Sequence, residues 1–412
     1  MDMATANIPS RTRRWQTGTR VVAALGLAVC GIAAIRANLA FALAESSPDL
    51  AIRLDPANAA AAAAEAESLL RGRDDPPTRA RAEQLARRAL ARDVTAASAA
   101  RILATTAAID GRKDEARRLM GISESLSHRD VQTQLMLIED AVQRNRVDEA
   151  VRHYDIALRT SPDLQGMLFP ILIRAAAQPE VARALTRALA TKPVWSDAFL
   201  DAVGRSAPDA RGAATLLAEA AQGGVHLPAQ AVAILIGRLV DQKKFGPAWR
   251  LYVAAYPSRQ QILRDRDFGQ ASQIVSPTWF DWILYPVEGR APRVVVTPAG
   301  TRLRIEAPNG AAGNAARQLL MLVPGHYRIE GRIYDRAAGS GPVTIGLTCA
   351  TTGKMLGSTP FPVANGAGSN LSLEATVPPE CESQWLDINA DGQDAIEGAK
   401  AEIGPLTVRK LE

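Results

Sequence analysis

The segment 147–162, VDEAVRHYDIALRTSP, decides how the first half of this chain folds. Ala150, Tyr154 and Ala157 recur at helical spacing, so they lie on one face of a predicted helix. Pro162 follows where that helix must end, because proline cannot continue a helix. A face made of small, aromatic and small side chains is typical of a helix that packs closely against a partner helix.

The same helix recurs upstream at a fixed interval. Ala82 and Ala116 precede Ala150 by 68 and 34 residues, and the turn residues Gly111 and Asn145 are also 34 residues apart. Glycine and asparagine tolerate the left-handed conformation that ends a helix. A 34-residue period predicts stacked helical hairpins, which we place over residues 45–257, with the most regular part at 78–162.

This pattern resembles the tetratricopeptide (TPR) repeat. The resemblance implies an α-solenoid whose concave face holds a protein partner. The residues that define the repeat are Ala82, Ala116, Ala150, Tyr154, Ala157 and Pro162.

Length and charge limit the remaining possibilities. The chain has 412 residues and is 47% hydrophobic, enough for two or three domains. Its net charge is +5, of which residues 1–20 supply +3. The rest of the chain therefore lacks the broad positive field that binds phosphate backbones, and we expect no nucleic-acid partner.

Residues 1–44 combine a basic tail with an apolar segment. Arg13 and Arg14 precede Val21–Ile35, and Arg36 follows at a position from which it could snorkel to lipid headgroups. We expect a single-pass inner-membrane anchor that leaves most of the chain in the periplasm.

Two other interpretations of this segment stay open. Ala42-Leu43-Ala44 fits a signal-peptidase site, which would release a periplasmic or secreted protein. A lipoprotein signal at Cys30 is disfavoured, because Val29 is bulky where a small residue is needed. All three interpretations export residues 45–412.

The second half changes to period-two alternation. After a linker at 258–278, we expect an antiparallel β-sandwich at 279–412 built from about eight short strands. Cys349 and Cys381 are 32 residues apart in this region, and in an oxidising compartment they favour a disulfide. Two buried free thiols are the alternative.

This half resembles jelly-roll carbohydrate-binding modules. The resemblance rests on Phe280-Asp281-Trp282, Pro324-Gly325-His326-Tyr327 and the segment 380–386. An anchor, TPR-like helices and such a sandwich together resemble accessory proteins of exopolysaccharide or cell-envelope assembly. The resemblance implies contact with polysaccharide, for which Trp279 and Trp385 are candidate stacking residues. Either tryptophan could instead serve packing, and Trp279 could dock the sandwich on the helices.

One motif suggests a metal. Asp387, Asn389 and Asp391, followed by Gly392, match the opening of a calcium-binding loop. Position twelve of such a loop would be Gly398 rather than a glutamate, and a polar hairpin loop is the alternative. We expect no cofactor apart from this weak calcium candidate.

Motifs for catalysis are missing from the sequence. His128, His153, His226 and His326 are scattered without a second ligand or a carboxylate at metal-binding spacing. No nucleophile elbow or phosphate-binding loop occurs. We therefore expect a membrane-anchored periplasmic scaffold without enzyme activity, acting in polysaccharide assembly or export. The alternative is a glycan-binding protein whose helices are only a spacer.

Overall fold

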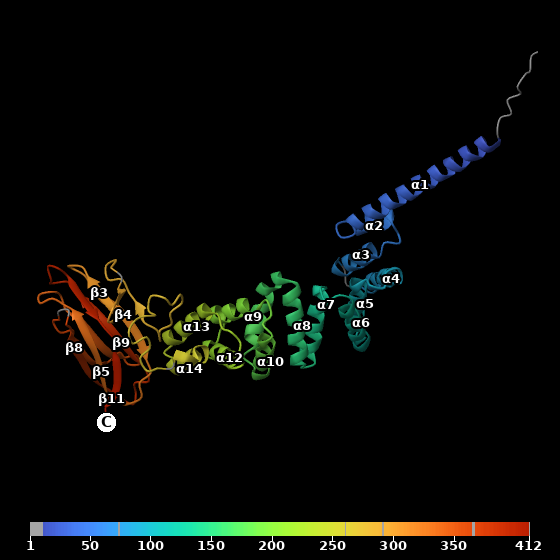
Figure 1. The fold of residues 1–412 in the computed structure, drawn as a ribbon. Coiled ribbons are helices and arrows are strands. Elements are labelled where there is room, and N and C mark those ends of the chain that lie inside the picture. The colour runs from blue at the N-terminus through green and yellow to red at the C-terminus, as the bar shows by residue number, and fades with distance from the viewer. Residues whose placement is uncertain (1–10, 73–74, 260, 291, 365–366, 412) are drawn as a thin grey trace, which may run out of the picture. The chain divides into compact units, whose positions relative to one another are not determined.

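The computed structural model describes residues 11–72, 75–259, 261–290, 292–364 and 367–411. The chain divides into two compact units, here called the N-terminal unit (residues 1–162) and the C-terminal unit (residues 163–412). This division falls inside the stretch 45–257 that the sequence presents as one solenoid. Each unit is described by itself (Figure 1).

The N-terminal unit is helical. One candidate membrane segment, Val22–Leu43, is long and apolar enough to cross a bilayer, and a signal sequence has the same properties. The helices are α1 (Arg11–Leu43), α2 (Pro48–Leu54), α3 (Ala59–Gly72), α4 (Pro76–Arg92), α5 (Ala97–Ile109), α6 (Lys113–Leu126), α7 (Val131–Gln143) and α8 (Val147–Thr160).

Consecutive helices of this unit pack in pairs, α3 with α4, α5 with α6 and α7 with α8. The repeated alanines lie at these contacts, since Ala82, Ala116 and Ala150 are all buried. Gly111 and Asn145 both have positive φ, as their place in the turns requires. The structure thus contains the predicted helical hairpins.

The C-terminal unit begins with further helices, which pack against a sandwich. They are α9 (Gln165–Ala175), α10 (Pro179–Ala190), α11 (Ser196–Ser206), α12 (Ala210–Gln222), α13 (Ala229–Asp241) and α14 (Phe245–Ala255), with 3₁₀ turns η1 (Pro162–Leu164) and η2 (Pro257–Arg259). The strands are β1 (Ile283–Leu284), β2 (Arg293–Thr297), β3 (Gly300–Ala307), β4 (Ala312–Leu320), β5 (Gly325–Asp335), β6 (Val343–Cys349), β7 (Met355–Pro360), β8 (Ser369–Val377), β9 (Gln384–Asp391), β10 (Ala399–Ile403) and β11 (Thr407–Leu411).

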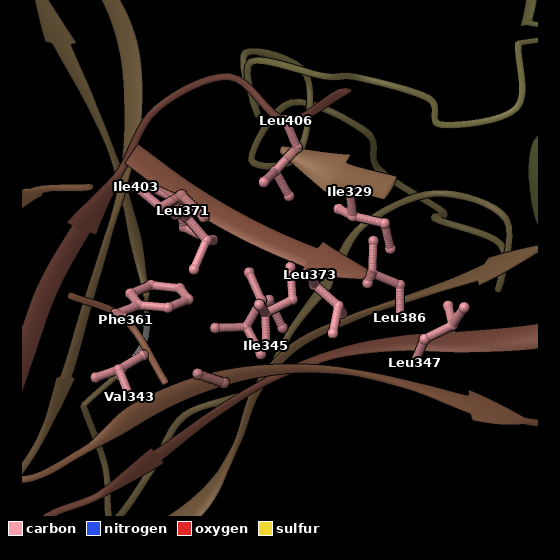
Figure 2. Packing of buried hydrophobic residues seen from close by; sticks show 14 of the residues in the cluster. Ile329, Val343, Ile345, Leu347, Phe361, Leu371, Leu373, Leu386, Ile403 and Leu406 are labelled. Carbon is pink, nitrogen blue, oxygen red and sulfur yellow. The ribbon is translucent and has the colours of Figure 1, made fainter. Parts of the chain in front are cut away.

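Two antiparallel sheets face each other. The five-stranded sheet has the order β1-β4-β9-β6-β7, and the six-stranded sheet has the order β11-β5-β10-β3-β2 with β8 paired to β5. Alternate residues of each strand meet between the sheets, as Ile345, Leu373 and Leu386 do in Figure 2. The predicted antiparallel β-sandwich is confirmed, with more strands than the eight expected.

The segment 258–278, which the sequence presents as a linker, is packed against the sandwich. Leu263 and Phe268 belong to the sandwich core, and Phe268 lies 5.1 Å from Trp282 between ring centroids. The polar and charged residues around these two apolar side chains concealed them in the sequence. The C-terminal unit is therefore continuous from its helices to its sheets.

Candidate functional site

The outer face of the five-stranded sheet carries a row of polar side chains. In the β4–β9 pairing Arg317 lies opposite Asp387 and Asn314 opposite Asn389. Because Leu386 and Ile388 point into the core, the alternate residues of β9 project from the outer face. Strand register thus brings together side chains from two distant parts of the sequence.

Hydrogen bonds hold this row in place. Arg317 donates from Nε to Asp387 Oδ1 at 2.5 Å and from Nη2 to Oδ2 at 3.2 Å. Asn314 Nδ2 donates to Asp387 Oδ1 at 2.7 Å and to Asn389 Oδ1 at 3.1 Å. A bidentate pair fixes both the position and the plane of each group. The contacts of the described residues leave Nη1 of Arg317 and Nδ2 of Asn389 free to donate.

An aromatic side chain lies beside the row. Tyr285 follows β1 and is half-buried. Burial raises the pKa of Tyr285, and the nearby charges of Arg317 and Asp387 act on it in opposite directions. Its hydroxyl therefore stays protonated at neutral pH. We define the polar row as Tyr285, Asn314, Arg317, Asp387 and Asn389.

Trp279 and Trp385 are brought together but are engaged in protein contacts. Their rings meet edge to face, with centroids 5.2 Å apart. The guanidinium of Arg317 lies 4.9 Å from the Trp385 ring centroid, and the Trp279 indole nitrogen lies next to Gly237 of α13. Trp279 thus packs between the helices and the sandwich. Both side chains are half-buried, so they border the polar row rather than project from it.

A buried arginine fixes the sandwich to α14. Arg264 is 4% exposed and lies about 5 Å from the ring centroids of Trp249, Tyr252 and Phe280. It donates to the carbonyl oxygens of Phe280 and, at 3.0 Å, of Leu319. Desolvation lowers the pKa of Arg264 to about 10, so it remains charged at neutral pH.

A buried aspartate completes this joint. The hydroxyl of Tyr252 donates to Asp281 Oδ1 at 2.8 Å, and Thr278 donates to Asp281 Oδ2. Asp281 is also the carboxylate whose charge favours the ionised form of Arg264. Leu319 lies two residues after Arg317 on β4. The joint therefore positions the strand that carries the polar row.

The residues of the calcium motif lie along β9 and not in a loop. Asp387, Asn389 and Asp391 occupy alternate positions of an extended strand, where four residues span about 13 Å. Asp387 is already paired with Arg317, and Asp391 accepts from the backbone of Gln393. The three side chains do not converge on one point. In the described ranges no group of three acidic, histidine or cysteine side chains could hold a metal ion.

The disulfide between Cys349 and Cys381 is present, as the sequence predicted, with Cα atoms 5.6 Å apart. Cys349 ends β6 and pairs with Gln384 at the start of β9. The adjacent loop reaches the helices, since Lys243 donates to the carbonyl of Thr351 at 3.2 Å. The bridge therefore ties together the end of the sheet that faces the helices.

The helices of the C-terminal unit form a separate groove. A volume of about 890 Å³ lies between α12 and α14. Ala214, Ala218 and Ala254 are among the small side chains that line it, and Trp249 and the exposed Arg250 border it. Small residues leave this volume open because they do not reach across the groove.

Sequence reasoning missed Tyr285, Asn314, Arg317 and Arg264. The stretch 312–320, AGNAARQLL, lacks the alternation of large apolar and polar residues that marks a strand. The single arginine in this small-residue stretch was the available signal. Its partner Asp387 is 70 residues away, which local patterns do not reveal.

Of the comparisons with known proteins, the one with solved structures finds similar chains. No protein-family model matches the chain, and no curated protein matches it. TmCBM61 in complex with beta-1,4-galactotriose is 13% identical, covering 37% of this chain and 99% of its own, with a TM-score of 0.29. A family 16 carbohydrate-binding module is 10% identical, covering 36% of this chain and 100% of its own, with a TM-score of 0.27.

CsCBM6-3 from Clostridium stercorarium, in complex with cellobiose, is 13% identical and covers 32% of this chain and 95% of its own, with a TM-score of 0.22. The sugars named in these complexes are those of the proteins concerned. Each match covers little more than a third of this chain or less.

Proposed function

We propose that this protein is a non-catalytic, membrane-tethered scaffold whose sandwich binds glycan through the polar row. The observation that carries the proposal is the free hydrogen-bonding capacity of Arg317 and Asn389, held rigidly on an outward sheet face beside Tyr285. Sugar hydroxyls donate and accept, so they suit a surface of fixed donors and acceptors. A site on paired strands is more rigid than one on loops.

The charged side chains on the opposite face of the sandwich are held differently from the polar row. On the six-stranded sheet Arg328 pairs with Glu374 at 2.6 Å, Lys400 with Asp335 at 2.8 Å, and Arg304 with Glu402. Charged side chains there are matched with one another across neighbouring strands. The Arg328–Glu374 pair is open to solvent, since its side chains are 42% and 62% exposed against 34% and 11% for Arg317 and Asp387, so it is held less firmly than the polar row.

The number of carboxylates in the polar row favours glycan binding without hydrolysis. Hydrolysis of a glycosidic bond generally uses two carboxylic groups, one as acid and one as base or nucleophile. The row contains Asp387, which is bound by Arg317 and Asn314. Both oxygens of this carboxylate are engaged by donors of the protein, and the row as defined has no second carboxylate.

Titration of the full-length protein in detergent with soluble envelope polysaccharides tests glycan binding. Arg317→Ala is expected to weaken binding by about tenfold or more, because a hydrogen bond to a charged group contributes about 1.5–3 kcal/mol. Arg328→Ala, on the opposite sheet, is the matched control and is expected to bind as the unchanged protein does. Equal affinities for the two variants, or no binding at millimolar glycan, would contradict the proposal.

The scaffold role is supported by the groove between α12 and α14. A protein partner in the periplasm would use this apolar floor, with Trp249 and Arg250 at its border, and the complex would act in polysaccharide assembly or export. Thr215→Arg places a long charged side chain at an exposed groove position. Loss of a crosslinked partner in this variant, with glycan binding intact, is the expected result; equal crosslinking would exclude the groove.

A further inference from the structure

Helix α1 has two parts with different surroundings. Between Val22 and Ile35 the large apolar side chains Val22, Leu25, Leu27, Val29, Ile32 and Ile35 are 59–75% exposed. Further along the same helix, Ala40 is 0% exposed and Ala44, just after its end, is 3% exposed. The first part offers apolar surface on all sides, whereas the second part is packed against protein.

The packed part meets α2 and α3. Ala40 and Ala44 form a small core with Ala51 of α2 and Ala61 of α3, both 0% exposed. Partly buried Leu43 lies against the same cluster. Four alanines allow the backbones to approach closely, as the repeated alanines do in the later hairpins. The carboxyl end of α1 therefore acts as the first helix of a hairpin with α2.

Arg36 strengthens this hairpin. Its guanidinium donates from Nε at 3.1 Å and from Nη2 at 2.8 Å to the carbonyl oxygen of Leu54, the last residue of α2. The final carbonyls of a helix lack partners within the helix, and a cation there also interacts favourably with the helix dipole. Arg36 thus holds the end of α2, a protein contact that the sequence did not indicate.

We infer that the mature protein keeps α1, with Arg36–Ala44 built into the folded N-terminal unit and Val22–Ile35 embedded in a lipid bilayer. Cleavage after Ala44 would remove Arg36 and Ala40, expose the apolar surfaces of Ala51 and Ala61, and leave the Leu54 carbonyl uncapped. This inference rests on the proposed export of the chain and decides between anchor and signal peptide.

The lipid-embedded part is short for a membrane span. Val22–Ile35 spans about 21 Å at 1.5 Å per residue, against about 30 Å for the hydrocarbon core. Helix α1 begins upstream at Arg11 in a basic stretch, so the difference is met by local thinning of the bilayer and by snorkelling of flanking residues. The docked end leaves no flexible connection between bilayer and helical unit, which sets the first hairpin at the membrane surface.

A thiol count on the protein purified from membranes tests retention. Cys349 and Cys381 are bonded to each other, so Cys30 is the free cysteine. We expect one maleimide per chain under denaturing, non-reducing conditions, an intact mass that includes residues 21–44, and resistance to alkaline extraction. A mass beginning at Glu45 or at a lipid-modified Cys30, or release by alkaline extraction, would overturn the inference.

A substitution within α1 tests docking separately. Ala40→Leu overfills the contact with α2 and α3, so we expect its unfolding midpoint to fall by about 3–6 °C. Phe41→Leu is the matched control, since Phe41 is 74% exposed, and is expected to leave the midpoint unchanged. An unchanged midpoint for Ala40→Leu would show that the docked hairpin is absent. Glycan titration of the same samples reports on the proposed function independently.

Discussion

The two compact units reach a packed interior by different means. In the N-terminal unit alanines dominate the helix contacts, for example Ala82, Ala86 and Ala99 in one cluster. In the C-terminal unit large aromatic side chains fill the contacts, as Trp195 and Phe199 do at a centroid distance of 5.7 Å. Regular hairpins can approach closely over small residues, whereas irregular helices and a helix–sheet joint leave larger gaps to fill.

Charge is used differently as well. Arg101 of the N-terminal unit binds Glu67 at 2.9 Å and Asp130 at 3.0 Å, which joins three successive hairpins by ion pairs. Arg264 of the C-terminal unit is held by backbone carbonyls and aromatic rings instead. The N-terminal unit therefore depends on many similar contacts and the C-terminal unit on a few specific ones.

The largest expected effect follows from removing the buried arginine. Arg264→Leu leaves the carbonyls of Phe280 and Leu319 and the charge of Asp281 without their partner, so we expect about 3–5 kcal/mol of lost stability. Hydrogen exchange should rise in α14 and β4 and stay unchanged in α3–α8. Arg250→Leu, an exposed position on α14, is the control. Hydrogen exchange that rises equally in both units would show that the effect of Arg264 is not confined to the C-terminal unit.

The next largest loss of stability is expected from removing the disulfide. Replacing Cys349 and Cys381 by alanine is expected to lower the unfolding free energy of the C-terminal unit by about 2–4 kcal/mol, because the open chain gains entropy when unfolded. Thermal unfolding of the full-length protein with and without reductant provides the measurement. Cys30→Ala serves as the control and should unfold as the unchanged protein does. No difference between oxidised and reduced protein would argue against a stabilising bridge.

A smaller effect is expected within the alanine contacts. Ala82→Leu forces a large side chain into a contact where Ala82 is 0% exposed, which should cost about 1–3 kcal/mol. Ala80, two residues earlier on the same helix, is exposed, so Ala80→Leu should be nearly neutral. Urea unfolding monitored by exchange in α3–α5 compares the two. Equal stability of the variants would mean that close backbone approach is not what holds the hairpins together.

The helical part was predictable from local sequence. Helix α8 begins at Val147 and ends at Thr160, two residues before Pro162, as the segment 147–162 predicts, because capping and turn conformation depend on neighbouring residues. Asn145 shows this directly, with a φ of 55° at the turn between α7 and α8. Local sequence was therefore sufficient to predict the helical hairpins.

The candidate site was predictable in part. Asp387, Asn389 and Trp385 were singled out, but as a calcium loop and a stacking residue. Their actual surroundings depend on Arg317, which joins them through strand register across 70 residues. Arg264 and Phe268 were hidden in a segment that reads as a linker. Non-local pairing decides these contacts, so composition and spacing could not supply them.

The smallest expected effect is the pH dependence of stability, which we attribute to the N-terminal unit. His153 of α8 is buried, and its Nδ1 donates to Gln134 Oε1 at 2.9 Å while Nε2 accepts from Arg152 at 3.0 Å. Burial lowers the pKa of His153 below its usual value of 6.5, and the charge of Arg152 lowers it further, against the opposing effects of Glu124 and Glu149.

A histidine with a lowered pKa stabilises the fold only while it is neutral. The unfolded chain binds the proton first, so the stability of the N-terminal unit should decline as pH falls below 6.5. Each unit of pKa displacement corresponds to about 1.4 kcal/mol. His153→Gln keeps one donor and one acceptor but does not titrate, and it should flatten the dependence between pH 7.5 and 5.5. His326→Gln, at an exposed position of the other unit, should not; if it flattens the profile equally, the effect does not arise from the buried ring.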